Sequence, residues 1–215
     1  MRILVCVKRV PITGGRMVLT ADEQAIETKH LGFTISPHEE CGVEEAVRIV
    51  EAGGGEVVVL TLGPEEAAEQ IRDCMAIGAD RGIHLVSSEE WDPQATAAAI
   101  ADAIRAEDPF DLIVFGNESA DAGGYQVGIR VAYALGLPVV TVKEGLNLPR
   151  YPSVPAKLRA KSKPLDARPV ERPASKLEKL RLVVPAGSRK QAEILGEGPG
   201  AAPRVVEVLQ QLGVA

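Results

Sequence analysis

The sequence has few aromatic residues, few cysteines and no long apolar run. Aromatic side chains make up 3% of the 215 residues, which argues against a surface that stacks the bases of single-stranded nucleic acid. The three cysteines (Cys6, Cys41 and Cys74) are scattered and odd in number, which excludes a four-cysteine metal site and is typical of a reducing compartment. No apolar run reaches the length of a membrane helix, so we expect no membrane span.

The charge and the amino-terminal residues narrow the range of binding partners and locations that we expect. A formal net charge of −6 argues against binding to nucleic acid or to an anionic membrane surface. Met1 leads directly into the apolar run Ile3-Leu4-Val5, with no visible signal or transit peptide, so we expect a cytoplasmic protein. Hydrophobic residues make up 46% of the chain, which is enough for a packed core.

Residues 1–142 alternate short apolar runs with helical patterns, and this alternation predicts an α/β domain. The runs are rich in β-branched residues and apolar on both faces, which is typical of buried parallel strands. The predicted strands are residues 3–7, 57–62, 83–86, 112–115 and 138–142, and the predicted helices are residues 39–52, 65–77, 93–106 and 123–135. We expect a doubly wound parallel sheet with strand order 3-2-1-4-5. Between the first strand and the first helix we expect a small hairpin or a long loop.

Residues 143–215 have a different composition. They contain 9 of the 15 prolines, and from Lys143 to Arg181 there are 11 basic and 4 acidic residues. Proline breaks helices and removes hydrogen-bond donors, so we expect little regular structure before an amphipathic helix at 204–212. A free tail would fit the prolines alone. The many leucines and valines instead favour an extended arm that packs on a partner protein.

Three predicted helices begin with residues that cap helices. Ser36-Pro37-His38-Glu39 has the spacing of a capping box, with Ser36 as the cap and Glu39 at the third helical position. Gly63-Pro64 and Asp92-Pro93 precede two more helices. Such helix starts expose free N–H groups that can bind an anion, although capping alone also explains each of them.

The segment 116–126 is the strongest candidate for a ligand site. It is polar and rich in glycine, and it runs from the fourth predicted strand into a helix. Glycines allow a ligand to approach the backbone closely. If the strand order is 3-2-1-4-5, this segment faces the loop after Cys6 across the topological switch point of the sheet, where nucleotides bind in such folds. The segment has neither a Walker loop nor a G-x-G-x-x-G fingerprint.

The sequence shows no catalytic constellation. His30, His38 and His84 lie far apart, and His84 falls within a predicted strand, so a core histidine is the simpler interpretation. Cys6 is also interpreted as a core residue, and Asp121 as a hydrogen-bond partner of a ribose or of the loop backbone. These features favour a carrier or binding module over a hydrolase.

Several stretches, in order along the chain, resemble electron-transfer flavoprotein β subunits. They are Ile3–Pro11, Gly42–Arg48, Ala76–His84, Gly116–Gly128, Asn147–Ser153 and the basic stretch through Lys163-Pro164-Leu165. The resemblance implies a subunit of a heterodimeric electron carrier, not a free-standing enzyme. It implies an α subunit as partner, with FAD held mainly on that subunit at the interface, and AMP or a second FAD bound to this chain. Flavin dehydrogenases would deliver electrons, and a quinone reductase or another acceptor would receive them.

The resemblance also implies which residues contact the nucleotide. Carried over position by position, they are Cys6, Ser36, Pro37, His38, Glu39, Leu62, Gly116, Asn117, Glu118, Ser119, Ala120, Asp121, Ala122, Gly123, Gly124, Tyr125 and Gln126. The family pattern Asn-Pro-Phe-Cys reads Ser-Pro-His-Glu here, and of the usual run of aspartates in the loop only Asp121 is present.

Two further departures concern the second half of the chain. The family usually has some tens of residues between the fifth strand and the Asn-x-Pro-Arg-Tyr-Pro motif, whereas here Val142 is followed almost at once by Asn147. The loop that recognises dehydrogenases would lie near residues 167–174, which show no clear match. The alternative from another class is an ATP-binding module like a universal stress protein, which would share the sheet and the switch-point site.

Overall fold

Six parallel strands form the main sheet of the chain. The computed structural model describes residues 1–12, 18–137, 139–174, 179–184 and 194–214. Contacts divide the chain into two compact units, Met1–Leu182 and Val183–Ala215, which are described separately. The strands are β1 (Arg2–Cys6), β4 (Glu56–Gly63), β5 (Arg81–Val86), β6 (Leu112–Gly116), β7 (Val140–Val142) and β8 (Leu165–Pro169).

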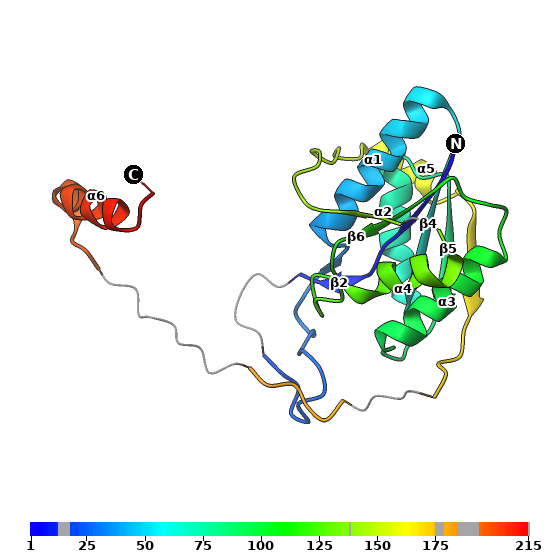
Figure 1. The fold of residues 1–215 in the computed structure, drawn as a ribbon, viewed down its shortest axis with the longest axis horizontal. Coiled ribbons are helices and arrows are strands. Elements are labelled where there is room, and N and C mark those ends of the chain that lie inside the picture. The colour runs from blue at the N-terminus through cyan, green and yellow to red at the C-terminus, as the bar shows by residue number, and fades with distance from the viewer. Residues whose placement is uncertain (13–17, 138, 175–178, 185–193, 215) are drawn as a thin grey trace. The chain divides into compact units, whose positions relative to one another are not determined.

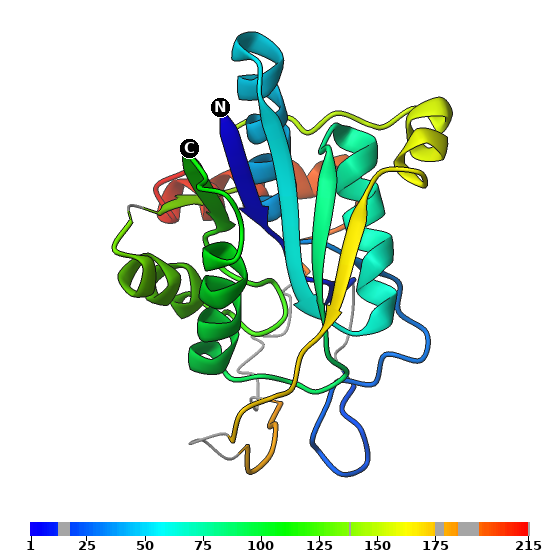
Figure 2. The same ribbon diagram turned by 90° about the vertical axis from the view of Figure 1, so that its right-hand side faces the viewer.

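The order of strands in this sheet is β7-β6-β1-β4-β5-β8, and every neighbouring pair is parallel. The predicted order 3-2-1-4-5 is therefore confirmed for the five predicted strands. The first strand lies in the middle of the sheet, where Leu4 pairs with Val58 on one side and with Ile113 on the other. Figure 2 shows β1, β4, β5 and β8 side by side, coloured from blue to yellow.

Helices cover both faces of the sheet, as a doubly wound fold requires. The helices are α1 (Pro37–Gly53), η1 (Glu65–Ala67), α2 (Ala68–Ile77), α3 (Pro93–Arg105), α4 (Gln126–Leu135) and α5 (Val154–Ala160). Apolar residues of α1 and α2 pack with one set of strand residues, and those of α3 and α4 pack with the alternate set (Figures 1 and 2). Because successive strand residues point to opposite faces, a run that is apolar throughout supplies both cores.

The predicted helices are present with shifts of a few residues. In α1 the expected stripe is confirmed, since Val43, Ala46 and Val47 are buried and Val50 is partly buried. The predicted helix 65–77 begins with the turn of 3₁₀-helix η1 before α2. The predicted helix 123–135 starts three residues late, because Gly123 has a left-handed φ of 58° that a helix does not allow.

The expectation of little regular structure across 143–203 is wrong for residues 154–169. Helix α5 packs against α2, and β8 adds a sixth strand to the sheet beside β5. Arg72 of α2 fastens the end of α5 and the turn before β8 to the sheet domain. Its Nη1 donates to the carbonyl of Ala160 at 2.8 Å and to that of Lys163 at 2.6 Å. The first compact unit extends to Leu182, well beyond the predicted boundary at residue 142. The segment 167–174 therefore begins within a strand, and only its second part follows β8.

The segment between β1 and α1 contains a short hairpin, as one of the two alternatives predicted. Strands β2 (Val10–Pro11) and β3 (Phe33–Thr34) pair in antiparallel fashion, and Leu19 bridges to Ile26. Residues 13–17 and Pro138, which belong to predicted elements, lie outside the described residues.

The second unit contains η2 (Gly198–Ala201) and α6 (Ala202–Gln211). The predicted closing helix at 204–212 is thus confirmed with a shift of two residues at its start. The described helices include none that is both long and apolar enough to cross a membrane.

Candidate functional site

The carboxyl ends of β1 and β6 lie next to each other in the middle of the sheet. The chain leaves β1 toward α1 and β4 on one side, and it leaves β6 toward α4 and β7 on the other side. The connections therefore diverge between these two strands, which makes this point the topological switch point. The sequence predicted that the loop after Cys6 and the segment 116–126 would meet here, and the contacts below show that they do.

The amino terminus of α1 is fixed by the predicted capping box. The Ser36 hydroxyl accepts a hydrogen bond from the Glu39 amide at 3.4 Å, and Glu39 Oε2 accepts one from the Ser36 amide at 3.2 Å. The same Oε2 accepts a second hydrogen bond, from the Lys8 amide at 3.0 Å. One buried carboxyl group thus ties the start of α1 to the residues that follow β1.

The segment 116–126 contacts the start of α1 directly. A Cβ atom on Gly116 would lie 2.8 Å from Glu39 Cγ and 3.5 Å from His38 Cβ, so only glycine fits at the end of β6. His38 Nε2 lies 3.5 Å from Glu118 Oε1, and His38 Nδ1 accepts a hydrogen bond from the Glu144 amide at 2.8 Å. His38 therefore contacts the loop that follows β6 and the loop that follows β7.

An ion pair joins the two sides of the switch point. Lys8 Nζ lies 2.8 Å from Asp121 Oδ1 and 2.7 Å from Asp121 Oδ2. Asp121 Oδ1 also accepts a hydrogen bond from the Ala122 amide at 2.8 Å. The expected contact of Asp121 with loop backbone is confirmed, and the contact with Lys8 is additional.

Side-chain and backbone hydrogen bonds shape the loop before α4. The carbonyl of Ser119 accepts from the Gly123 amide at 2.9 Å, and its hydroxyl accepts from the Gly124 amide at 3.0 Å. Gly123 has φ +58°, and a Cβ atom placed on it would meet no atom within 4 Å. Helix α4 begins at Gln126 without a side-chain cap. Its first N–H groups have no partner within the helix and can bind an anion.

Burial and hydrogen bonds shift the acidities of two carboxyl groups in the site. Burial raises the pKa of Glu39 from 4.5 to about 8, against the opposing effect of the Lys8 and Ser36 amides. A hydrogen bond from the Tyr125 hydroxyl lowers the pKa of Glu118, and His38 lowers it to a smaller extent. In turn, Glu118 raises the pKa of Tyr125.

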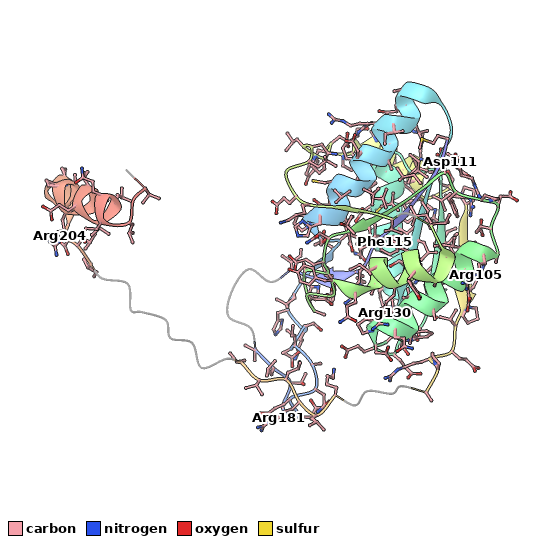
Figure 3. All side chains as sticks on the ribbon, in the orientation of Figure 1. Arg105, Asp111, Phe115, Arg130, Arg181 and Arg204 are labelled. Atoms are coloured by element: carbon pink, nitrogen blue, oxygen red, sulfur yellow. The ribbon has the colours of Figure 1, made fainter. Side chains whose placement is uncertain are left out.

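The remaining predicted residues are less closely involved in these contacts. Cys6 is the last residue of β1 and packs, together with the partly buried Leu62, among the core residues on the α3 and α4 side. Phe115 lies in the same layer, between the sheet and α4 (Figure 3), where a Cβ on Gly128 would come within 3.2 Å of its ring. The Gln126 side chain accepts from Arg130 at 3.0 Å. Pro37 and Ala120 are exposed at the surface.

The other residues with reactive side chains, His84 and Cys6, are buried in the core. The interpretation of His84 as a satisfied core histidine is confirmed, since it is buried with Nε2 3.3 Å from the carbonyl of Gly63. Burial raises the pKa of the Cys6 thiol. Within the described part of the chain, no group of three or more histidine, cysteine or acidic side chains could hold a metal ion.

Two cavities lie outside the candidate site. One of about 400 Å³ lies between α2 and the 150–163 stretch. The other, of about 680 Å³, lies beyond the ends of β4, β5 and β8. None of the predicted nucleotide contacts lines either cavity.

Known proteins resemble this chain along most of its length. The family model for the electron transfer flavoprotein domain matches residues 25–148. The chain is 30% identical to an electron transfer flavoprotein subunit beta of Syntrophomonas wolfei, over 96% of this chain and 95% of that protein. It is 31% identical to the mitochondrial electron transfer flavoprotein subunit beta of Arabidopsis thaliana, over 80% of this chain and 82% of that protein.

A relative from a named enzyme complex is also similar. The chain is 34% identical to the caffeyl-CoA reductase-Etf complex subunit CarD of Acetobacterium woodii, over 69% of this chain and 57% of that protein. The alignment with the Syntrophomonas protein spans 242 positions, more than the 215 residues of this chain. That relative therefore carries residues with no counterpart here.

Proposed function

We propose a function that starts from the family of this chain, which belongs to the electron transfer flavoprotein β subunits. Membership makes the chain a subunit of an electron carrier that is associated with flavin, and it implies an α subunit with which the chain forms a heterodimer. It also decides against the universal stress protein alternative, which shares only the type of sheet and the place of the site.

Within this family, the chain binds AMP or a second FAD at the switch point, while FAD lies mainly on the α subunit at the interface. Three features support this assignment. The contacts of Lys8 and Glu39 bring the residues after β1, the start of α1 and the segment 116–126 together. Gly123 leaves open space where any side chain would project. The uncapped start of α4 offers N–H donors to a phosphate.

The redox chemistry of such a carrier belongs to the flavin, which accepts and releases electrons. The residues of this chain bind and orient the nucleotide. Gly116 and Gly123 let the ligand and the neighbouring helix approach the backbone, and Ser36 with Glu39 keeps α1 in register with the end of β1. We assign no catalytic residue to this chain.

The carboxyl-terminal part of the chain, within the predicted arm 143–215, is proposed to pack on the α subunit. Large apolar residues there are exposed, which favours a partner over solvent. They are Leu180, Val183, Val184, Ile194, Val205, Val206, Leu209, Leu212 and Val214. Flavin dehydrogenases as donors, a quinone reductase or another acceptor, and a cytoplasmic location belong to the same proposal. The relative from Arabidopsis thaliana is named as mitochondrial.

Co-expression with an electron transfer flavoprotein α subunit tests this function. We expect the two chains to purify together as a yellow complex whose flavin is reduced by a dehydrogenase or by NADH, whereas this chain alone is colourless and less stable, because a partner that binds only the folded state stabilises it by mass action. A sharply melting monomer that no α subunit binds would contradict the proposal. Reduction by NADH with two FAD bound would favour an electron-bifurcating form.

A further inference from the structure

We propose that Lys8 is the cation that binds the phosphate of the nucleotide, and that Asp121 holds the Lys8 ammonium until a phosphate replaces the carboxylate. This inference rests on the proposed nucleotide site. It adds a residue that the family motif did not assign, and it predicts that the site binds a phosphorylated ligand more tightly than an unphosphorylated one.

The backbone of Lys8 is held in a fixed position. Its amide donates to Glu39 Oε2 at 3.0 Å, and the Glu39 carboxyl group is buried. The preceding residue, Val7, donates to the carbonyl of Leu60 at 2.9 Å, and its own carbonyl accepts from the Thr61 hydroxyl at 2.6 Å. The Lys8 side chain therefore extends from a rigid point at the carboxyl end of β1, where parallel sheets of this kind bind their ligands.

The ammonium group of Lys8 is available for exchange. The Lys8 side chain is 44% exposed and that of Asp121 is 21% exposed, so solvent screens the pair and makes it weak. A phosphate offers three strong acceptor oxygens and more negative charge than one carboxylate. After the exchange, Asp121 keeps its hydrogen bond from the Ala122 amide, so the loop does not lose all of its contacts.

The other charges around the loop make such a cation necessary. The carboxylates of Glu118 and Asp121 lie on the segment itself. Carboxylates repel a phosphate, so a phosphorylated ligand needs a compensating positive charge at this edge of the sheet. Lys8 supplies that charge, and the phosphate of AMP and the diphosphate of FAD both offer the required chemistry.

Binding of AMP, FAD and adenosine to the α–β complex, freed of its bound nucleotide, tests the inference. In the wild-type complex AMP binds more tightly than adenosine. Lys8→Gln weakens the affinity for AMP by about tenfold or more, since a charge-assisted contact is lost. The same variant changes the affinity for adenosine by less than about twofold. Asp121→Asn strengthens AMP relative to adenosine, and Lys8→Arg restores part of the lost affinity. Lys157→Gln on α5 removes the same charge far along the chain and changes neither ligand.

The outcomes separate the inference from the proposed function. If the wild-type complex binds AMP or FAD and Lys8→Gln binds it equally well, the inference is wrong and the site stands. If Lys8→Gln weakens AMP and adenosine to the same extent, the ion pair only fastens the loop, and the inference is again wrong. If the wild-type complex binds none of the three ligands, both the inference and the nucleotide site are wrong.

Discussion

The carboxyl group of Glu39 accepts two backbone hydrogen bonds and is almost fully buried. It caps α1, accepts from the Lys8 amide and lies against Gly116, so one side chain positions three parts of the site. Its burial raises its pKa to about 8. The folded protein therefore retains a proton at Glu39 under conditions in which an unfolded chain would release it.

Replacing this group changes how stability depends on pH. Between the ordinary pKa of 4.5 and the folded pKa of about 8, the folded state binds more protons than the unfolded state, so the Glu39 contribution to stability falls as pH rises, by up to about 1.4 kcal/mol per pH unit. Glu39→Gln keeps an acceptor oxygen and cannot ionise. Melting temperatures of the wild-type and Glu39→Gln complexes, measured from pH 5 to 8, should diverge as pH rises, with the variant losing less stability. Parallel curves would show that Glu39 does not titrate in this range.

Gly123 tests whether open space in the loop serves a ligand. Gly123→Val and Gly136→Val form a matched pair, because both glycines have left-handed φ values, 58° and 63°, and neither would bring a Cβ within 4 Å of another atom. Each substitution should cost about 1–3 kcal/mol of stability through backbone strain. Only Gly123→Val should also lower the nucleotide content of the purified complex, by at least about half. Equal nucleotide content in the two variants would place the ligand elsewhere.

Local spacing makes some of these residues predictable from sequence, and distance in sequence hides others. The pattern of Ser36 and Glu39 predicts the capping box because both residues belong to one helical turn. The pairing of Lys8 with Asp121 spans 113 residues, and only the order of the strands brings them together. A lysine directly after the first strand, opposite a loop with one aspartate, was the available signal.

At the scale of elements, strands with an apolar sequence are predictable, and the polar edge strand β8 is not. Four of the predicted strands are apolar runs with buried centres, and the fifth, β7, is an apolar run that ends at the buried Val142. Strand β8 alternates apolar, charged and proline residues and is mostly exposed, as edge strands often are. Its prolines are compatible with a strand, because Pro169 ends β8 and the carbonyl of Pro164 accepts from the Gly82 amide at 3.0 Å.

Arg72 is expected to hold this edge in place. Arg72→Ala leaves the carbonyls of Ala160 and Lys163 without this donor, which should cost about 1–3 kcal/mol. Amide hydrogen exchange should speed up in β8 and α5 while β1 keeps its protection. Arg130→Ala is the control, because Arg130 is exposed and bonds to the neighbouring Gln126 side chain, and its effect should stay within about 0.5 kcal/mol. Unchanged exchange in β8 would show that Arg72 does not hold this edge in place.

At the scale of the whole molecule, the first unit includes residues 143–182, which the composition had assigned to an arm. The Leu182 amide donates to the carbonyl of Glu23 at 2.8 Å, and the Gln24 side chain donates to the carbonyl of Leu180 at 2.8 Å. Residues 180–182 thus belong to the first unit. Proline content misplaced this boundary because proline disfavours helix interiors without preventing a strand or loop from packing.

Deleting residues 183–215 should separate folding from partnership. The remaining chain is the first unit, residues 1–182, and it keeps the sheet and its helices. Its circular dichroism spectrum should therefore still be that of a folded α/β protein. Its affinity for the α subunit should fall by at least about tenfold if the exposed apolar residues of the second unit lie at the interface. Co-purification and titration with the α subunit measure this, and an undiminished affinity would place the interface on the first unit.

The identity and number of nucleotides in the α–β complex test the central claim most directly. The complex is denatured, and the released ligands are identified by mass and counted per heterodimer. We predict one FAD together with one AMP, or two FAD, because one adenine nucleotide belongs to the crevice between β1 and the segment 116–126. A complex that releases a single FAD and no second adenine nucleotide would contradict the account.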